Sequence, residues 1–270
     1  MFAAFPGLDT PGLLGFAFAV LLLAGFVKGV IGLGLPTISV GLLGLVLAPL
    51  EAAALLLVPN LVTNFWQLLV GPDLRAIMRR LWPMLAGIVA GTLLAAAWFP
   101  LGGAASFPLG GVARFPPGGV AWATPLLGAA LALYAGFGLF ALQLGVAARH
   151  EAWAGPLVGA ATGAVTILTG VFVLPAVPYL QALRLQKDDL VQALGLSFQI
   201  STLALAAALL WQGEFRMPQA GASLLALLPA LGGMLLGQVL RARISAQVFR
   251  RCFFGGLLLL GCYLMLKALL

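Results

Sequence analysis

The sequence predicts an all-α, polytopic membrane protein, and three observations lead to that fold class. Hydrophobic residues occupy 63% of the 270 positions and charged residues only 8%, whereas soluble domains carry about a quarter charged residues. The mean hydropathy is +1.13. The few charges leave long uncharged runs between them, among them 29–50, 81–113 and 152–183. Because about 18 apolar residues suffice to cross the ~30 Å hydrocarbon layer, these runs predict membrane-spanning helices.

Ten apolar segments can be drawn from these runs. They cover roughly 11–29, 33–48, 51–70, 81–99, 121–146, 153–172, 173–183, 190–211, 218–240 and 252–269. The second and the seventh are short and contain Gly and Pro, which weaken a helix. They either span the membrane as broken helices or re-enter it, so the sequence predicts eight to ten transmembrane segments.

Basic residues predict the orientation. Threading the segments alternately places eleven of them on one side: Lys28, Arg75, Arg79, Arg80, Arg149, Arg184, Lys187, Arg241, Arg243, Arg250 and Arg251. The other side receives only Arg114, Arg216 and Lys267. Because Lys and Arg are enriched in cytoplasmic loops, the first side is predicted to be cytoplasmic, with both termini facing outward.

The two halves of the chain resemble each other. Pairs at an offset of 139 are Pro36 with Pro175, Asn60 with Gln199, and Thr63 with Thr202; pairs at 134 are Gly25 with Gly159 and Gly29 with Gly163. Five segments per half would insert the second half upside down, an arrangement typical of transporters with broken helices. We therefore expect core helices of a first repeat in 1–100, a Gly- and Pro-rich outer link in 101–120, a helix that ends the first half in 121–150, and an inverted second repeat in 151–270.

The most irregular apolar stretch runs from Gly25 to Thr37. It includes Gly29, Gly32, Gly34 and Pro36, so backbone groups are freed there, and lipid tolerates that only where protein or water satisfies them. Lys28 lies within this stretch. It is either a buried cation that contacts an anion or a side chain that extends to the cytoplasmic surface.

Polar side chains gather on predicted helix faces. The third segment carries Asn60, Thr63, Asn64 and Gln67 at the spacing i, i+3, i+4, i+7, which places them on one face. The second half carries Ser197, Gln199, Ser201 and Thr202, and a smaller stripe of Thr162, Thr166 and Thr169. These groups either line a polar site or form hydrogen bonds between helices, and the threonines can also bond to their own helix.

Other chemistry has little support in the sequence. No carboxylate falls in the middle of an apolar segment, and there is no His pair, Cys–His set or phosphate-binding loop. We therefore expect no enzyme, metal site or cofactor. The basic residues form no stripe with interleaved aromatics, which argues against nucleic-acid binding.

The run Ala24-Gly-Phe-Val-Lys-Gly-Val-Ile-Gly-Leu-Gly34, with Pro36 and the Pro-Leu-Glu-Ala that opens the next helix, resembles the TauE/SafE sulfite-exporter family, also called toluene-sulfonate uptake permeases. The resemblance implies transport of sulfite or small organosulfonates across a bacterial inner membrane. The family's Gly-rich hairpin corresponds to Lys28, Gly29, Gly32 and Gly34, whereas the second half has threonines where glycines would be denser.

The resulting hypothesis is an exporter of small sulfur-containing anions, and a channel-like pore or a membrane scaffold subunit are the alternatives. The only other partners expected are the lipid bilayer and, as an open alternative, further copies of the chain. Substrate contacts are expected from residues of both halves: Lys28, Gly29, Gly32, Gly34, Thr37, Asn60, Thr63, Asn64, Gln67, Thr166, Thr169, Gln199 and Thr202.

Overall fold

The computed structural model describes residues 10–99, 123–140, 145–213, 217–241, 243 and 245–267. These residues form helices and no strands: α1 (Pro11–Ile31), α2 (Leu35–Leu43), α3 (Pro49–Leu55), α4 (Leu57–Val70), α5 (Leu74–Trp98), α6 (Ala123–Leu139), α7 (Ala148–Thr169), α8 (Ala176–Ala182), α9 (Lys187–Trp211), α10 (Met217–Leu240) and α11 (Ala246–Lys267). Six of them are long and apolar enough to cross a membrane, or seven spans if α3 and α4, which meet at 56°, count as one. The predicted all-α, polytopic fold is confirmed.

In both halves, the first long helix ends at a glycine in the left-handed conformation. Gly32, at φ 78°, closes α1 by donating its N–H to the Lys28 carbonyl, and Gly170, at φ 71°, closes α7 on the Thr166 carbonyl. Glycine enters this left-handed conformation without the steric penalty that a side chain brings. The short helices α2 and α8 follow these two turns.

The short segments connect opposite ends of the bundle. Gly34, just before α2, lies close to Phe253 near the start of α11, Gly41 lies close to Leu260, and the Leu45 carbonyl accepts a hydrogen bond from Lys267. The segment 33–48 therefore runs along α11 from one end towards the other. In the second half, Gly170 lies against Pro49, whereas the Ala182 carbonyl accepts the N–H of Val146 at the start of α7. Although α2 and α8 are too short to span by themselves, their segments cross between the two ends.

One of these ends collects the predicted cytoplasmic loops, and we call it the basic end. It comprises the turns 32–34, 71–73, 145–147 and 183–186, together with Arg241, which lines the same cavity as Gly32 and Gly71. Several hydrogen bonds hold these turns in place. Gln67 bonds to the Gly32 carbonyl, Gln192 accepts the Asp73 N–H, and Val146 bonds to Ala182. Lys267 lies at the opposite end; Arg114 and Arg216 are outside the described residues.

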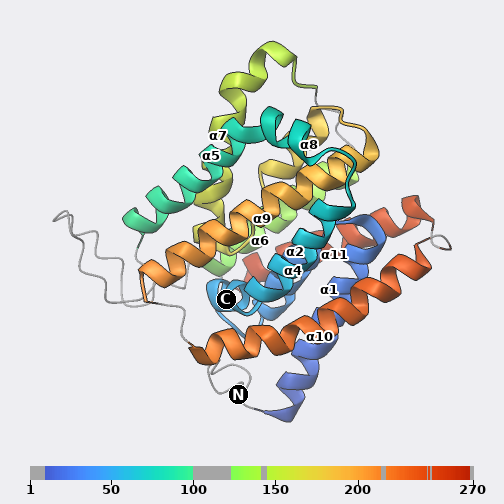
Figure 1. The fold of residues 1–270 in the computed structure, drawn as a ribbon. Helices are drawn as coiled ribbons and strands as arrows, with labels where there is room; N and C mark the ends of the chain where they lie inside the picture. Colours follow the sequence, from blue (N-terminus) through green and yellow to red (C-terminus); the bar gives the residue numbers. More distant parts are fainter. Residues whose placement is uncertain are drawn as a thin grey trace.

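Glycines set the tightest helix pairings. α1 packs along α10, and α5 packs along α7, with α4 and α9 in contact between these two pairs (Figure 1). A Cβ built on Gly29 would lie 2.2 Å from the Met234 carbonyl oxygen, and one on Gly159 would lie 2.1 Å from that of Met84. Such backbone-to-backbone approach requires glycine. The Gly-xxx-Gly motifs of these four helices all serve the two pairings: Gly25/Gly29, Gly87/Gly91, Gly159/Gly163 and Gly233/Gly237.

The helix contacts keep their pattern when the halves are exchanged. If α1 corresponds to α7 and α5 to α10, then the α1–α10 pair becomes the α7–α5 pair, whereas α4–α9 and α6–α11 map onto themselves with α6 matched to α11. This is the pattern expected from a two-fold relation between the halves. The inverted repeat remains a prediction, and its proposed link, 101–120, lies outside the described residues.

We predict that Gly233→Ala destabilises the protein and Gly232→Ala does not. A Cβ on Gly233 would meet the Leu22 carbonyl oxygen at 2.0 Å, whereas one on Gly232 would meet nothing within 4 Å. Overpacking of this kind costs about 1–3 kcal/mol, while alanine at an open helical site gains up to ~1 kcal/mol over glycine. Thermal unfolding in detergent should show a lower midpoint for the first variant alone; equal midpoints would contradict the packing.

Candidate functional site

Lys28 is the one lysine or arginine buried within the described part of the chain. Its side chain is 3% exposed. The ammonium group donates to Thr63 Oγ1 at 2.9 Å and to Asn64 Oδ1, both on α4. A buried cation needs such partners because its desolvation is expensive. The sequence left open whether Lys28 reaches the surface, and in the structure it stays inside.

The polar face of α4 is organised around the end of α1. Thr63 donates its own proton to the Pro59 carbonyl at 2.7 Å, which leaves its oxygen to accept from Lys28. One turn later, Gln67 Nε2 donates to the Gly32 carbonyl at 2.8 Å, where α1 has ended and its last carbonyls lack helical partners. Thr63, Asn64 and Gln67 thus all bind the Lys28–Gly32 turn.

A cavity of about 170 Å³ opens beside Lys28. Four predicted site residues line it: Lys28, Gly29, Gly32 and Gln67. The remaining lining residues come from α4, α9, α10 and the adjoining turns: Trp66, Val70, Gly71, Asp188, Val191, Met234, Gln238 and Arg241. Asp188, Gln238 and Arg241 are exposed, as are Trp66 and Val70 near the end of α4, whereas Lys28 is buried. The cavity therefore opens at the basic end, beside the exposed side of α4, and Lys28 lies at its floor.

Other predicted site residues lie away from this cavity. Gly34 begins α2, where a Cβ would clash with Val27 at 2.7 Å. Thr166, Thr169 and Thr202 donate to carbonyls four residues back in their own helices. These three threonines therefore bond to their own helices, as Thr63 also does, and their contact with substrate remains a prediction.

Several buried polar atoms have no hydrogen-bond partner among the described residues. They are Thr37 Oγ1, Ser39 Oγ, Asn60 Oδ1, Asn64 Nδ2, Gln67 Oε1, Tyr134 Oη, Gln199 Oε1 and Ser201 Oγ. Buried polar groups are normally satisfied by protein or water. Five of these atoms lie on α4 and α9, and a sixth belongs to the predicted site residue Thr37 of α2.

Two of these unpartnered atoms, on Asn60 of α4 and Gln199 of α9, lie where the two helices pack against each other. Gln192 donates to the Leu68 carbonyl, and Gly195 lies close to Gln67, so the two helices run antiparallel. Continuing this register by about one turn brings Asn60 opposite Gln199. The contact between α4 and α9 is therefore polar at Asn60 and Gln199, the two residues that the internal repeat pairs.

Gln192 and the residues that α10 contributes to the cavity were not predicted from the sequence. Gln192 is 1% exposed; it donates to the Leu68 carbonyl at 2.8 Å and accepts the Asp73 N–H at 3.2 Å. It thereby satisfies backbone groups where α4 ends and α5 begins. The available signal was a glutamine within an apolar helix, two turns before the predicted site residue Gln199. Gln238 gave a similar signal next to Gly237.

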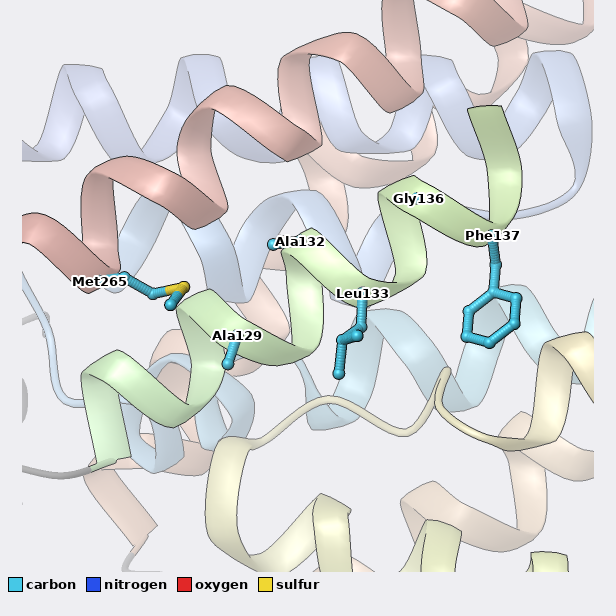
Figure 2. Close-up of a pocket in the computed structure, with 6 residues that line it drawn as sticks. All are labelled: Ala129, Ala132, Leu133, Gly136, Phe137 and Met265. Carbon is cyan, nitrogen blue, oxygen red and sulfur yellow. The ribbon is translucent and has the colours of Figure 1, made fainter. Parts of the chain in front are cut away.

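A larger hollow of about 550 Å³ lies on the outer surface of α6 and α11. Figure 2 shows its lining residues, Ala129, Ala132, Leu133, Gly136, Phe137 and Met265, none of which carries a charge or a hydrogen-bonding side-chain group. Such a groove suits lipid rather than an anion. Within the described residues, no group of three or more His, Cys, Asp or Glu could hold a metal ion.

The bundle of apolar helices, six of which are long enough to cross a membrane, defines a polytopic membrane protein. The profile of the family described as Sulfite exporter TauE/SafE matches residues 17–264, so the chain belongs to this family of membrane transporters. Membership implies a small sulfur-containing anion as substrate and confirms the resemblance found in the glycine-rich hairpin. Searches of curated proteins and of solved structures each found no match.

We predict that Gln192→Leu lowers the free energy of unfolding by about 1–3 kcal/mol. The substitution leaves the buried Leu68 carbonyl without its partner, and it also removes the acceptor of the part-buried N–H of Asp73, an exposed residue. Thermal unfolding in detergent measures the effect. Gln247→Leu, on the exposed first turn of α11, is the control. Equal midpoints for the two variants would show that the hydrogen bonds of Gln192 to the α4–α5 turn do not stabilise the protein.

Proposed function

We propose that this protein exports small sulfur oxyanions, such as sulfite or a short organosulfonate, and that Lys28 binds the anion. The observation that carries the proposal is a buried ammonium group at the floor of a cavity that is open at one end. A lysine ammonium has three donors. Thr63 and Asn64 accept two of them, so one donor remains for an anion in the cavity.

The charges around the cavity favour an anion. Asp188 is the sole carboxylate in its lining, and it lies at the exposed mouth rather than beside Lys28. The neutral donors nearby add hydrogen bonds without charge, among them the unpartnered Asn64 Nδ2. A volume of about 170 Å³ equals that of about five or six water molecules at ~30 Å³ each, which accommodates sulfite or a short sulfonate.

The proposed direction rests on the basic end. If basic loops are cytoplasmic, the cavity opens to the cytoplasm and both chain termini are periplasmic. An inside-negative potential then drives an anion outward with ~2.3 kcal/mol per charge per 100 mV. Export would therefore need no proton relay. This agrees with the described helices, which bury no carboxylate that could carry a proton.

A carrier fits the packing better than an open pore. Under the correspondence of the halves, in which Gly29 matches Gly163, Thr162 takes the place of Lys28, and Thr92 that of Gln238. Both are fully buried, and Gly163 of α7 lies directly against Thr92. The cavity's counterpart at the opposite end is thus filled by helix packing. Inverted halves that exchange these two arrangements would alternate access between the two sides.

We predict that Lys28→Met reduces sulfite flux at least tenfold. A hydrogen bond to a charged group contributes about 1.5–3 kcal/mol, which corresponds to a roughly tenfold to hundredfold loss of affinity. Initial rates in proteoliposomes with an imposed potential measure the effect. Lys267→Met removes a lysine at the opposite end of the bundle and should stay within about twofold of wild type. Equal rates for wild type and Lys28→Met, with both proteins folded, would exclude Lys28 as the anion contact.

We also predict that the cavity is reached from the cytoplasm. The chain's two cysteines, Cys252 and Cys262, are replaced by serine, and Gln238→Cys is introduced into the cavity wall. A membrane-impermeant maleimide should label this cysteine in inside-out vesicles much faster than in right-side-out vesicles. Methanesulfonate should slow the labelling; sulfite is avoided because it reacts with maleimides. Faster labelling from the periplasmic side would reverse the proposed orientation.

A further inference from the structure

The mouth of the cavity carries two opposite charges that the proposed anion contact does not use. Met234, Gln238 and Arg241 follow one another at i, i+4 and i+7, so they share one face, and all three line the cavity. Met234 is 5% exposed and Arg241 is exposed. Seven residues of helix rise about 10 Å, so this face leads from the floor beside Lys28 to the mouth.

The position of this face is fixed by backbone contact. A Cβ on Gly29 would lie 2.2 Å from the Met234 carbonyl oxygen and 2.9 Å from the Gln238 amide nitrogen. Because Gly29 follows Lys28 directly, the α1–α10 contact holds the α10 face next to the buried cation. Arg241 is therefore held in line with Lys28 along the cavity.

Arg241 and Asp188 are both available to a solute. Both line the cavity, and neither forms an ion pair with another described residue. The single ion pair among the described residues joins Arg80 and Glu151, which lie outside the cavity lining. A guanidinium group presents a planar fork of donors that matches two oxygens of an oxyanion, which an ammonium group cannot do. Asp188 repels the same anion.

We propose that Arg241 captures the oxyanion at the mouth of the cavity, that Asp188 opposes this capture, and that the pair sets the concentration at which transport saturates. The inference rests on the proposed function and extends it, because it assigns anion selection to the mouth and leaves the inner contact to Lys28. Arg241 acts on the apparent affinity, since the anion passes it before reaching the floor.

The test measures initial rates of sulfite and methanesulfonate uptake into inside-out vesicles, over a range of concentrations, at low and at high ionic strength. Arg241→Gln should raise KM about two- to tenfold, as expected for losing one charge about 10 Å from the bound anion. Its maximal rate should stay within about twofold of the wild-type rate. Asp188→Asn should lower KM about twofold. Both effects should shrink at ~0.5 M salt, where charges are screened over a few ångströms.

Arg243→Gln is the matched control. Arg243 has the same charge, is exposed and lies two residues away, but does not line the cavity, so its KM should equal that of wild type. Arg241→Lys should give an intermediate KM, because it keeps the charge and loses the fork. A KM for Arg241→Gln equal to that of the control, or a higher KM for Asp188→Asn, would overturn the inference. Absence of saturable wild-type uptake would instead refute the proposed function itself.

Discussion

The structure depends on accommodating one positive charge inside a membrane protein. Lys28 is buried, and its ammonium group is satisfied by two neutral side chains of α4, Thr63 and Asn64, instead of by a carboxylate. A carboxylate would neutralise the charge and remove its attraction for an anion. Neutral acceptors hold the side chain in place and leave its charge uncompensated, which is what an anion-binding site in a low-dielectric region requires.

Backbone geometry places this charge where a solute can reach it. α1 ends at Gly32, one turn after Lys28, and Gln67 caps the carbonyl that the turn exposes. Gly29 lets α10 approach closely enough for its last turns to form one wall of the cavity. The glycine-rich stretch therefore serves two purposes: it breaks the helix beside the cation, and it brings a distant helix against it. In the second half, Gly170 ends α7 in the same left-handed turn; under the proposed correspondence of the halves, the buried Thr162 takes the place of the lysine.

The sequence predicted the helices well because hydropathy and the Gly and Pro breaks determine them locally. It also predicted the α4 face, since Asn60, Thr63, Asn64 and Gln67 follow helical spacing. It could not predict that Gln238 and Arg241 join Lys28, because that contact bridges about 200 residues and four helices carry equivalent Gly-xxx-Gly motifs, which do not specify their partners. The threonines of α7 were ambiguous for a local reason: spacing alone does not distinguish a threonine that bonds to its own helix from one that faces a cavity.

Binding of the transported oxyanion by the buried Lys28 ammonium can be observed directly in a crystal. Selenite has the shape and charge of sulfite and scatters anomalously, so a crystal structure with selenite bound locates the anion directly. We expect an anomalous peak in the cavity, with a selenite oxygen within hydrogen-bonding distance of Lys28 Nζ and close to Asn64. A peak elsewhere in the protein, with only water beside Lys28, would contradict it.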